Sequence, residues 1–506
     1  MSEPLHPAGR PPRLHIGFRT DVPAGGGGGG ANQRAARALR EAFDVRDALE
    51  EADLQIRSFS WEAPETPARL FLDHGSFADA SFWAYTSRSL RPGDTILVAS
   101  EVCVQIAARL LRPGSVQILK VPLPIDRDRF LPSRDRGLLR REIAAAHGIP
   151  VDGPLLLVVA AFVRRKNHHH ALDLLAALRR SRPDCRLAFV GTVPDRDASR
   201  RYREQIEARA AEGDLEGAVH FLEALPAGAV ARLMAASDAL VHLSTCRLEN
   251  FGLVVAEAAA SGLPVLAADW GGLRDIVRDG VTGHLAPTWL SDRGPRVDWR
   301  ALVAPALELL ERPQAWRVMS DAARAMAESE LALETHATRL RAAVASALAW
   351  SRGSAGPVEW TPDGQELAFR TIALNAAHPE IKDTGDEFRL LVPLEGGRYY
   401  RLLAGPAASF DRTPRVRPED RLAAIVRWRD AGDGIDIDDP VWPSRLELDP
   451  AGRKLLGQLD GRRTLGSLLG EIAGSPGETA TLEATAQRLA DAGLVGTGSP
   501  LRPKAT

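Results

Sequence analysis

The chain has 506 residues, of which 45% are hydrophobic and 26% are charged, and its formal net charge is −2. This length accommodates about three ordinary domains, and the small net charge argues against a protein that binds nucleic acid or an anionic membrane with its whole surface. The three cysteines are odd in number and far apart in the sequence, so they indicate neither a disulfide framework nor a zinc site. No apolar stretch reaches the ~20 residues of a membrane span and the N-terminus lacks a signal-peptide core, so we expect no membrane span and a cytoplasmic protein.

The first part of the chain alternates predicted strands with predicted helices. The strand "LHIGF" at 14–18 is followed by a glycine run, Gly25–Gly30, and then by a predicted helix at 31–43. The same alternation starts again further along, so the sequence predicts an α/β protein with two doubly wound domains that face each other across a cleft. We assign residues 1–128 to the first, acceptor-binding domain, and residues 129–352 to the second domain with its closing helices.

The composition changes after the linker "SRGSAGP" at 351–357. Residues 353–442 are rich in Pro, Gly and Asp and are predicted to form a β-rich connecting region, with a hairpin in "EFRLLVPLEGGRYYRLLAG". Residues 443–500 contain three predicted helices. We therefore expect a C-terminal α+β extension that ends in a compact helical unit.

The most informative segment is "CRLENFGLVVAEAAASGLPVLAAD", which begins at Cys246. Asn250 is a suitable N-cap, and the Gly-Leu-Pro sequence that follows stops a helix, so a helix is predicted at 251–261. This leaves Glu249 just before the helix and Glu257 two turns inside it.

The predicted helix start suits an anion. Its first free amides would be those of Phe251, Gly252 and Leu253, which carry partial positive charge. Glu257 would lie about 10 Å further along the helix axis, a separation that matches a nucleoside diphosphate between its ribose and its sugar. The alternative is that Glu257 is an ordinary solvent-facing residue and Glu249 an ordinary acid near a helix start.

Residues 155–290 resemble the donor-binding half of a family-4 glycosyltransferase of the GT-B architecture. The matching motifs occur in the family's order: "FVRRKNHHHAL", "AFVGTVPD", "VHFLEALP" and the segment from "SDALVHLSTCRLENFG" to "DGVTGHLAP". The resemblance implies two Rossmann-like domains, and a retaining, metal-independent transfer from a nucleotide-diphosphate sugar without a further cofactor. It also implies that the helix at 332–351 ties the two domains together.

The resemblance implies a role for each matching residue. Glu257 would bind the nucleotide ribose, Glu249 would lie beside the transferred sugar, and Lys166 would neutralise the diphosphate. The other implied donor-binding residues are Arg164, Arg165, Asn250, Phe251, Gly252, Leu253, Thr282 and Gly283.

Two further candidates lie in the first domain. In related enzymes a polar residue or a histidine approaches the reacting sugar near the position of His74, and the alternative is an ordinary loop histidine. Gly26, Gly27, Gly28 and Gly29 would allow a phosphate or an acceptor to approach the backbone closely, and the alternative is a low-complexity linker.

The sequence also departs from the family pattern. Ala161 stands where the family has a phosphate-binding arginine, Glu223 where it has a glycine, and Asp275 where it has a glutamate. Arg164 or Arg165 is a possible substitute for the missing arginine. These departures leave open a catalytically degenerate scaffold that binds a peptide or protein, and the glycine run leaves open a dinucleotide-dependent oxidoreductase.

Two apparent metal motifs are better explained otherwise. His168, His169 and His170 are consecutive, and consecutive helical residues point about 100° apart, so they do not share one face. The acidic run at 432–439 lacks the spacing of a calcium loop and reads as a solvated turn.

The C-terminal unit resembles the winged-helix domains (PqqD-like) that recognise leader peptides. The residues that carry the resemblance are "LDPAGRKLLGQLDGRRTLGSLL" and "RLADAGLV". It implies that the acceptor is a ribosomally made peptide or a small protein. The last helix offers one arginine against Glu483 and Asp491, so DNA is disfavoured, and a helical cap or an oligomerisation module remains the alternative.

Overall fold

The structure is a computed structural model. It describes residues 12–16, 36–37, 39–40, 43–46, 51–58, 69–73, 90–291, 294–353, 357–366, 405–409, 413, 415–438 and 444–496. The glycine run Gly25–Gly30, His74, most of the predicted helix at 31–43 and nearly all of the predicted hairpin at 387–405 lie outside these residues.

The first domain is built on a six-stranded parallel sheet with the order β2-β1-β3-β4-β5-β6. Successive residues of a strand face opposite sides of the sheet. Accordingly Ile96 and Val98 pack with helix α3 (Glu101–Leu110), whereas Leu97 belongs to the core beneath helix α12 (Leu333–Gly353). The strands are β1 (Arg13–Ile16), β2 (Asp44–Arg46), β3 (Leu54–Ser58), β4 (Arg69–Asp73), β5 (Thr95–Val98) and β6 (Gln117–Lys120).

The second domain repeats this plan with the strand order β12-β11-β10-β7-β8-β9, again parallel. Its first strand in the chain, β7, lies in the middle between β10 and β8. The strand order therefore reverses at β7, which is where open α/β sheets form their ligand crevice. The strands are β7 (Leu155–Val159), β8 (Arg186–Val190), β9 (Val219–Leu222), β10 (Ala239–His242), β11 (Val265–Ala268) and β12 (Gly283–Ala286), and the helices are α4 (Arg136–His147), α5 (His168–Arg179), α6 (Asp197–Ala210), α7 (Ala227–Ala236), α8 (Leu253–Ala260) and α9 (Leu273–Ile276).

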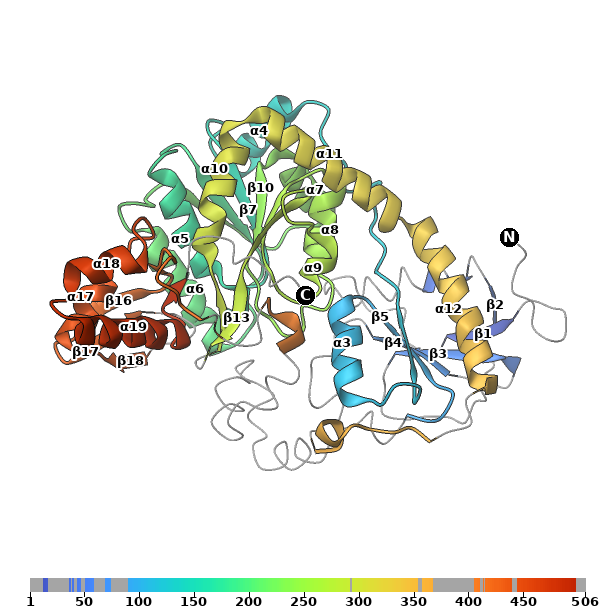
Figure 1. Ribbon diagram of the computed structural model, residues 1–506. Coiled ribbons are helices and arrows are strands. Elements are labelled where there is room, and N and C mark those ends of the chain that lie inside the picture. The colour runs from blue at the N-terminus through green and yellow to red at the C-terminus, as the bar shows by residue number, and fades with distance from the viewer. Residues whose placement is uncertain are drawn as a thin grey trace.

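Two crossings of the chain between the domains, near residues 122–125 and 331–336, lie side by side. Ile125 N–H donates to Leu331 O at 2.9 Å, and His336 Nδ1 lies 2.8 Å from Pro122 O. After α10 (Val303–Glu311) and α11 (Pro313–Glu330), helix α12 leaves the second domain and lies along the first sheet (Figure 1). The predicted doubly wound domains are thus confirmed, and α12 ties them together as expected.

The C-terminal extension packs on the second domain. Its sheet β16-β17-β18 is antiparallel and begins at Arg427, so it crosses the domain boundary that we predicted at residue 443. Asp433, in the acidic run, lies in the turn between β16 and β17 and pairs with Arg445. The elements are β15 (Ala423–Ala424), β16 (Arg427–Asp430), β17 (Gly434–Asp438), β18 (Ser444–Glu447), α17 (Pro450–Gln458), α18 (Leu465–Ile472), α19 (Pro476–Asp491) and β19 (Val495–Gly496).

Direct contacts fix the extension in place. Trp299 Nε1 donates to Ile425 O at 2.9 Å, and the Arg427 guanidinium forms two hydrogen bonds with the Glu212 carboxylate at 2.9 and 3.0 Å. Trp299 lies in η3 (Trp299–Leu302), directly after the hairpin of β13 (Thr288–Ser291) and β14 (Gly294–Val297). Among the described helices of the whole chain, none is long and apolar enough to cross a membrane.

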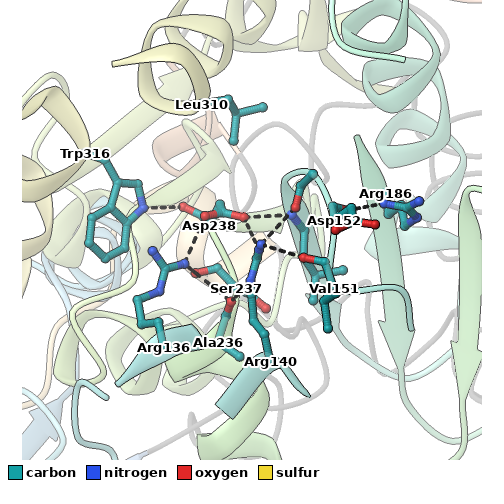
Figure 2. Close-up of polar contacts among 12 residues, drawn as sticks. Arg136, Arg140, Val151, Asp152, Arg186, Ala236, Ser237, Asp238, Leu310 and Trp316 are labelled. Atoms are coloured by element: carbon teal, nitrogen blue, oxygen red, sulfur yellow. Dashed lines mark hydrogen bonds and ion pairs between the residues drawn. The ribbon is translucent and has the colours of Figure 1, made fainter. Parts of the chain in front are cut away.

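Asp238, just before β10, holds together the amino edge of the second sheet (Figure 2). Its carboxylate accepts hydrogen bonds from Arg136 Nη2 at 2.9 Å, from Leu155 N–H at 2.7 Å and from Arg140 Nη2. Its backbone oxygen accepts from Trp316 Nε1 at 2.7 Å. Because these partners come from α4, β7 and α11, the side chain and backbone oxygens of one residue join two helices to the two central strands.

We predict that Asp238→Ala destabilises the protein by about 2–3 kcal/mol, because two partly buried guanidinium groups lose their shared carboxylate. The measurement is the midpoint of urea unfolding, followed by a probe of the second domain. Asp195→Ala is the control, since the Asp195–Arg200 pair is exposed and its loss should leave the midpoint unchanged. Equal midpoints for the two variants would contradict the assignment.

Candidate active site

Lys166 and Glu249 meet at the carboxyl edge of the second sheet, where the strand order reverses. Lys166 ends the short turn η2 (Arg164–Lys166) after β7, and Glu249 lies in the loop after β10. Because β7 and β10 are neighbours, these two loops adjoin, and the Lys166 ammonium forms an ion pair with Glu249 Oε2. The side chains are 20% and 11% exposed, so the pair is largely screened from water.

Asn167 fixes the turn that carries Lys166. Its backbone is left-handed, with φ of 52°, a conformation that asparagine tolerates better than most residues. Its buried amide Nδ2 donates to Leu243 O at 2.8 Å and to Thr245 Oγ1 at 3.0 Å, while Thr245 N–H donates to Arg165 O at 3.0 Å. The β7 turn is therefore bonded to the β10 loop, which determines where the Lys166 side chain begins.

His242 is a third member of the site that the sequence analysis missed. It is the last residue of β10, it is 4% exposed, and its Nε2 lies 3.4 Å from Glu249 Oε2. A polar residue at the end of a buried apolar strand was the signal that could have revealed it.

The charge state of Glu249 follows from these neighbours. Burial raises its pKa, but the positive charge of Lys166 and the hydrogen bond with His242 outweigh burial and hold the pKa well below its usual range. Glu249 is therefore ionised at neutral pH.

The helix after Glu249 starts later than we predicted. Helix α8 begins at Leu253, and its cap is Gly252, whose φ is 89°, so the prediction of Asn250 as the N-cap was wrong. A left-handed residue cannot belong to a right-handed helix, so the helix cannot start before Gly252. Val255 N–H and Ala256 N–H both donate to Gly252 O; the first free amides of the helix are therefore those of Leu253 and Val254.

Asn250 and Phe251 are instead buried in the turn before α8. Asn250 is 2% exposed, and the described residues provide no hydrogen-bond partner for its Nδ2. Phe251 is 3% exposed and packs in the core of the second domain. An amide with an unused donor, next to Glu249 and the helix start, is suited to receive a polar ligand.

A glycine pair supports the turn that carries Glu249. A Cβ on Gly271 would overlap Glu249 O, and one on Gly272 would overlap Asn250 O. Without side chains there, Gly272 N–H donates to Glu249 O at 2.8 Å, and Trp270 Nε1 donates to Cys246 O at 2.8 Å. The loop after β11 thus packs in direct contact with the backbone of Glu249 and its neighbours.

The remaining predicted residues, apart from Thr282 and Gly283, divide into two groups. Arg164 is half-buried and Arg165 is exposed, both in the same turn as Lys166, and Glu257 is half-buried one turn inside α8. The other predicted positions, His74 and Gly26–Gly29, lie outside the described residues.

Thr282 and Gly283 are not brought to this site. Gly283 pairs with Val265, at the amino end of β11, which is the edge of the sheet opposite to Glu249. The Thr282 hydroxyl accepts from Arg278 N–H at 2.8 Å and donates to Ile276 O at 3.2 Å. Its role in the structure is to close this turn.

The three consecutive histidines form the first turn of α5, and their side chains are buried. The His168 ring stacks on Phe162 with 4.5 Å between centroids, and His169 Nδ1 lies 3.1 Å from the Tyr202 hydroxyl. Burial lowers the pKa of His168 to about 3, so it is neutral. Among the residues that the structure describes, no group of His, Cys, Asp and Glu could hold a metal ion.

Part of the chain is similar to known proteins. Residues 140–326 match the family model described as "Glycosyl transferases group 1". The chain is 30% identical over 233 residues to the GDP-mannose-dependent alpha-(1-6)-phosphatidylinositol monomannoside mannosyltransferase of Mycolicibacterium smegmatis, covering 45% of this chain and 56% of that protein. It is 34% identical over 198 residues to a D-inositol 3-phosphate glycosyltransferase of Actinosynnema mirum, covering 38% and 45%. The chain thus spans about half the length of these relatives.

Solved structures show the same fold. Sucrose-phosphate synthase from Thermosynechococcus elongatus has a TM-score of 0.52 at 20% identity, over 67% of this chain and 100% of that chain. HepE from Anabaena, solved with UDP and glucose, has a TM-score of 0.50 at 17% identity, again over 67% and 100%. The two parallel-sheet domains therefore have the GT-B fold, and residues 140–326 are related to the group 1 glycosyl transferases.

Proposed function

We propose that the protein is a glycosyltransferase that moves a sugar from a nucleotide-diphosphate sugar to an acceptor. The observation that carries this proposal is the meeting of Lys166 and Glu249 at the reversal point of the second sheet, beside the free amides of α8. A cation and helix amides suit a diphosphate, and a carboxylate suits sugar hydroxyls.

In the free protein Lys166 and Glu249 neutralise each other. A diphosphate carries more negative charge than one carboxylate, so the donor competes for Lys166. Glu249 is thereby released and accepts hydrogen bonds from the sugar. Asn250 Nδ2, which is buried beside it, is a further donor for the same ligand.

The transfer step needs positive charge where the leaving diphosphate forms. Lys166 and the amides of Leu253 and Val254 supply this charge from fixed positions, so we propose a metal-independent reaction. Glu257, further along α8, would bind the ribose. We also propose that the anomeric configuration is retained, because the family that the chain resembles is a retaining one.

A catalytically degenerate scaffold is the second candidate, and Ala161 favours it because the arginine of related enzymes is absent there. The ionised, partly buried Glu249 beside Lys166 favours an enzyme, because a buried charge pair is costly to maintain without a function. A dinucleotide-dependent oxidoreductase has no such support, since its glycine run lies outside the described residues.

The first experiment is a panel of UDP-, GDP-, ADP- and TDP-sugars incubated with the purified full chain, with hydrolysis followed by release of the nucleotide. We expect one or two donors to be hydrolysed slowly, because water replaces the acceptor. Glu257→Ala should abolish binding of the active donor. No binding of any donor by the unaltered protein would favour the degenerate scaffold.

The second experiment separates the two members of the ion pair. Glu249→Gln should bind the free nucleoside diphosphate roughly two- to fivefold more tightly, because Lys166 loses its competing partner, yet it should lose about 100-fold in sugar transfer or hydrolysis. Lys166→Met should weaken both. Arg317→Met is the control for loss of one positive charge, because Arg317 is exposed on α11 and follows Trp316, which binds Asp238 at the opposite, amino edge of the sheet. Weaker binding of the nucleoside diphosphate by Glu249→Gln would contradict this competition.

We further propose that the acceptor is a peptide held by the C-terminal extension. A groove of about 600 Å³ lies between residues 415–419 and helices α18 and α19, lined by apolar Val416, Pro418 and Leu465 and by charged side chains. Residue 415 is six residues from Ser409, which contacts Asp269 in the loop after β11. Six residues span at most about 22 Å, so a peptide held in the groove is within reach of the cleft.

The groove predicts a specific loss of peptide binding. Ala484 lines the groove and is exposed, so Ala484→Trp should fill the groove without disturbing the fold. In selection from a displayed library of random peptides, this variant should lose the peptides that the unaltered protein retains. Thr481→Trp, on the same helix but outside the groove, is the matched control. Retention of the same peptides by both variants would refute the proposed site.

A further inference from the structure

Residues Gly405–Ser409, which we call the cleft strap, belong to the connecting region but lie against the second domain. We propose that the cleft strap is a positioning element of the active site, which fixes the turn carrying Glu249 and links the second domain to α3. Its kinetic consequence rests on the proposed function; its structural consequence does not.

The strap is bonded to the loop after β11 by its backbone. Gly271 N–H donates to Ala407 O at 2.7 Å, and Ala408 forms an antiparallel bridge with Trp270. Arg274 Nη1 donates to Pro406 O at 3.1 Å and to Ala408 O at 3.2 Å. The strap is thus joined to this loop by hydrogen bonds and by one isolated β-bridge.

Ser409 closes the end of the strap. Its Oγ donates to Asp269 Oδ2 at 2.5 Å and accepts from Thr288 N–H at 2.9 Å. The same Asp269 carboxylate pairs with Arg274 Nε at 3.1 Å. The Asp269 carboxylate therefore binds Ser409 directly and is linked through Arg274 to the carbonyl groups of Pro406 and Ala408.

The loop that the strap holds is the loop that supports Glu249. Trp270 is fully buried and donates to Cys246 O, and Gly272 N–H donates to Glu249 O. One face of residues 270–272 is bonded to the strap and the other to residues 246–249. A change in the strap would thus reach Glu249, the carboxylate proposed to bind the sugar, through residues 270–272 alone.

The opposite side of the strap faces the first domain. The turn η4 (Gly405–Ala407) contacts α3, and Ala407 and Ala408 are 2% and 5% exposed (Figure 1). Next to this contact, Asp275 Oδ2 accepts from Glu101 N–H, at the start of α3, at 2.9 Å and from Lys120 Nζ at 3.4 Å.

The polar contacts given above join the strap to the second domain, so it moves with that domain. It presents a small apolar surface to α3. The strap therefore takes part in setting how closely the two domains approach, in addition to supporting the turn of Glu249.

The test compares two variants of the connecting region, each of which replaces one hydroxyl-bearing residue with alanine. Ser409→Ala removes the hydroxyl that closes the strap. Thr361→Ala is the matched control, because Thr361 Oγ1 also donates to backbone, to Arg109 O at 2.7 Å, but at the far end of α3. Hydrogen–deuterium exchange is measured on the free full-length chain for peptides covering residues 246–253 and 269–275.

We expect roughly fivefold faster exchange in both peptides for Ser409→Ala, from the loss of a buried hydrogen-bonded group, and no change for Thr361→Ala. Ser409→Thr keeps the hydroxyl and should restore slow exchange. Unchanged exchange at 246–253 in Ser409→Ala, or the same change in Thr361→Ala, would overturn the proposal.

A second measurement tests the kinetic consequence. With the donor identified by the nucleotide-sugar panel, Ser409→Ala should lower kcat and raise the donor KM by several-fold. Its melting temperature should be similar to that of Thr361→Ala. A merely structural role would lower the melting temperature and leave kcat and KM unchanged. If no nucleotide sugar is bound by the unaltered protein, the proposed function fails, and the exchange measurement still decides whether the strap positions the turn.

Discussion

The site depends on the hydrogen bonds that join the loop after β7 to the loop after β10. Asn167 makes them from a left-handed backbone, and they place Lys166 against Glu249. The ion pair of Lys166 and Glu249 lies at the edge of the sheet where the strand order reverses. At such a point the loops diverge and leave a crevice. The proposed binding of a nucleotide-diphosphate sugar rests on that placement.

The position of the carboxylate is controlled from the other side by close backbone packing. The loop after β11 lies on the turn of Glu249 because Gly271 and Gly272 have no Cβ atoms to hold it away. The cleft strap adds a third layer from a distant part of the chain. The site is therefore built from three consecutive backbone layers, of which only the two inner layers belong to the segment that matches the group 1 glycosyl transferase model.

The C-terminal extension packs closely against the second domain. A Cβ on Gly493 would overlap the Arg296 side chain, and one on Gly496 would overlap the Asp298 carboxylate. Such close contact, together with the Arg427–Glu212 ion pair, leaves little freedom for the extension to turn. A ligand held in the groove described above would therefore keep a nearly constant position relative to the second domain.

The sequence by itself determined the two doubly wound domains, because hydrophobic periodicity reports on neighbours along the chain. The family resemblance pointed to Lys166 and Glu249 as separate candidate site residues, and the ion pair between them appeared only in the structure. The tertiary structure decided the rest. Helix α8 starts after Gly252 because packing against the β11 loop imposes its φ; Thr282 lies at the opposite edge because strand register places it there; and His242 joins the site because two neighbouring strands end together. Each of these depends on contacts between distant segments, which no local pattern encodes.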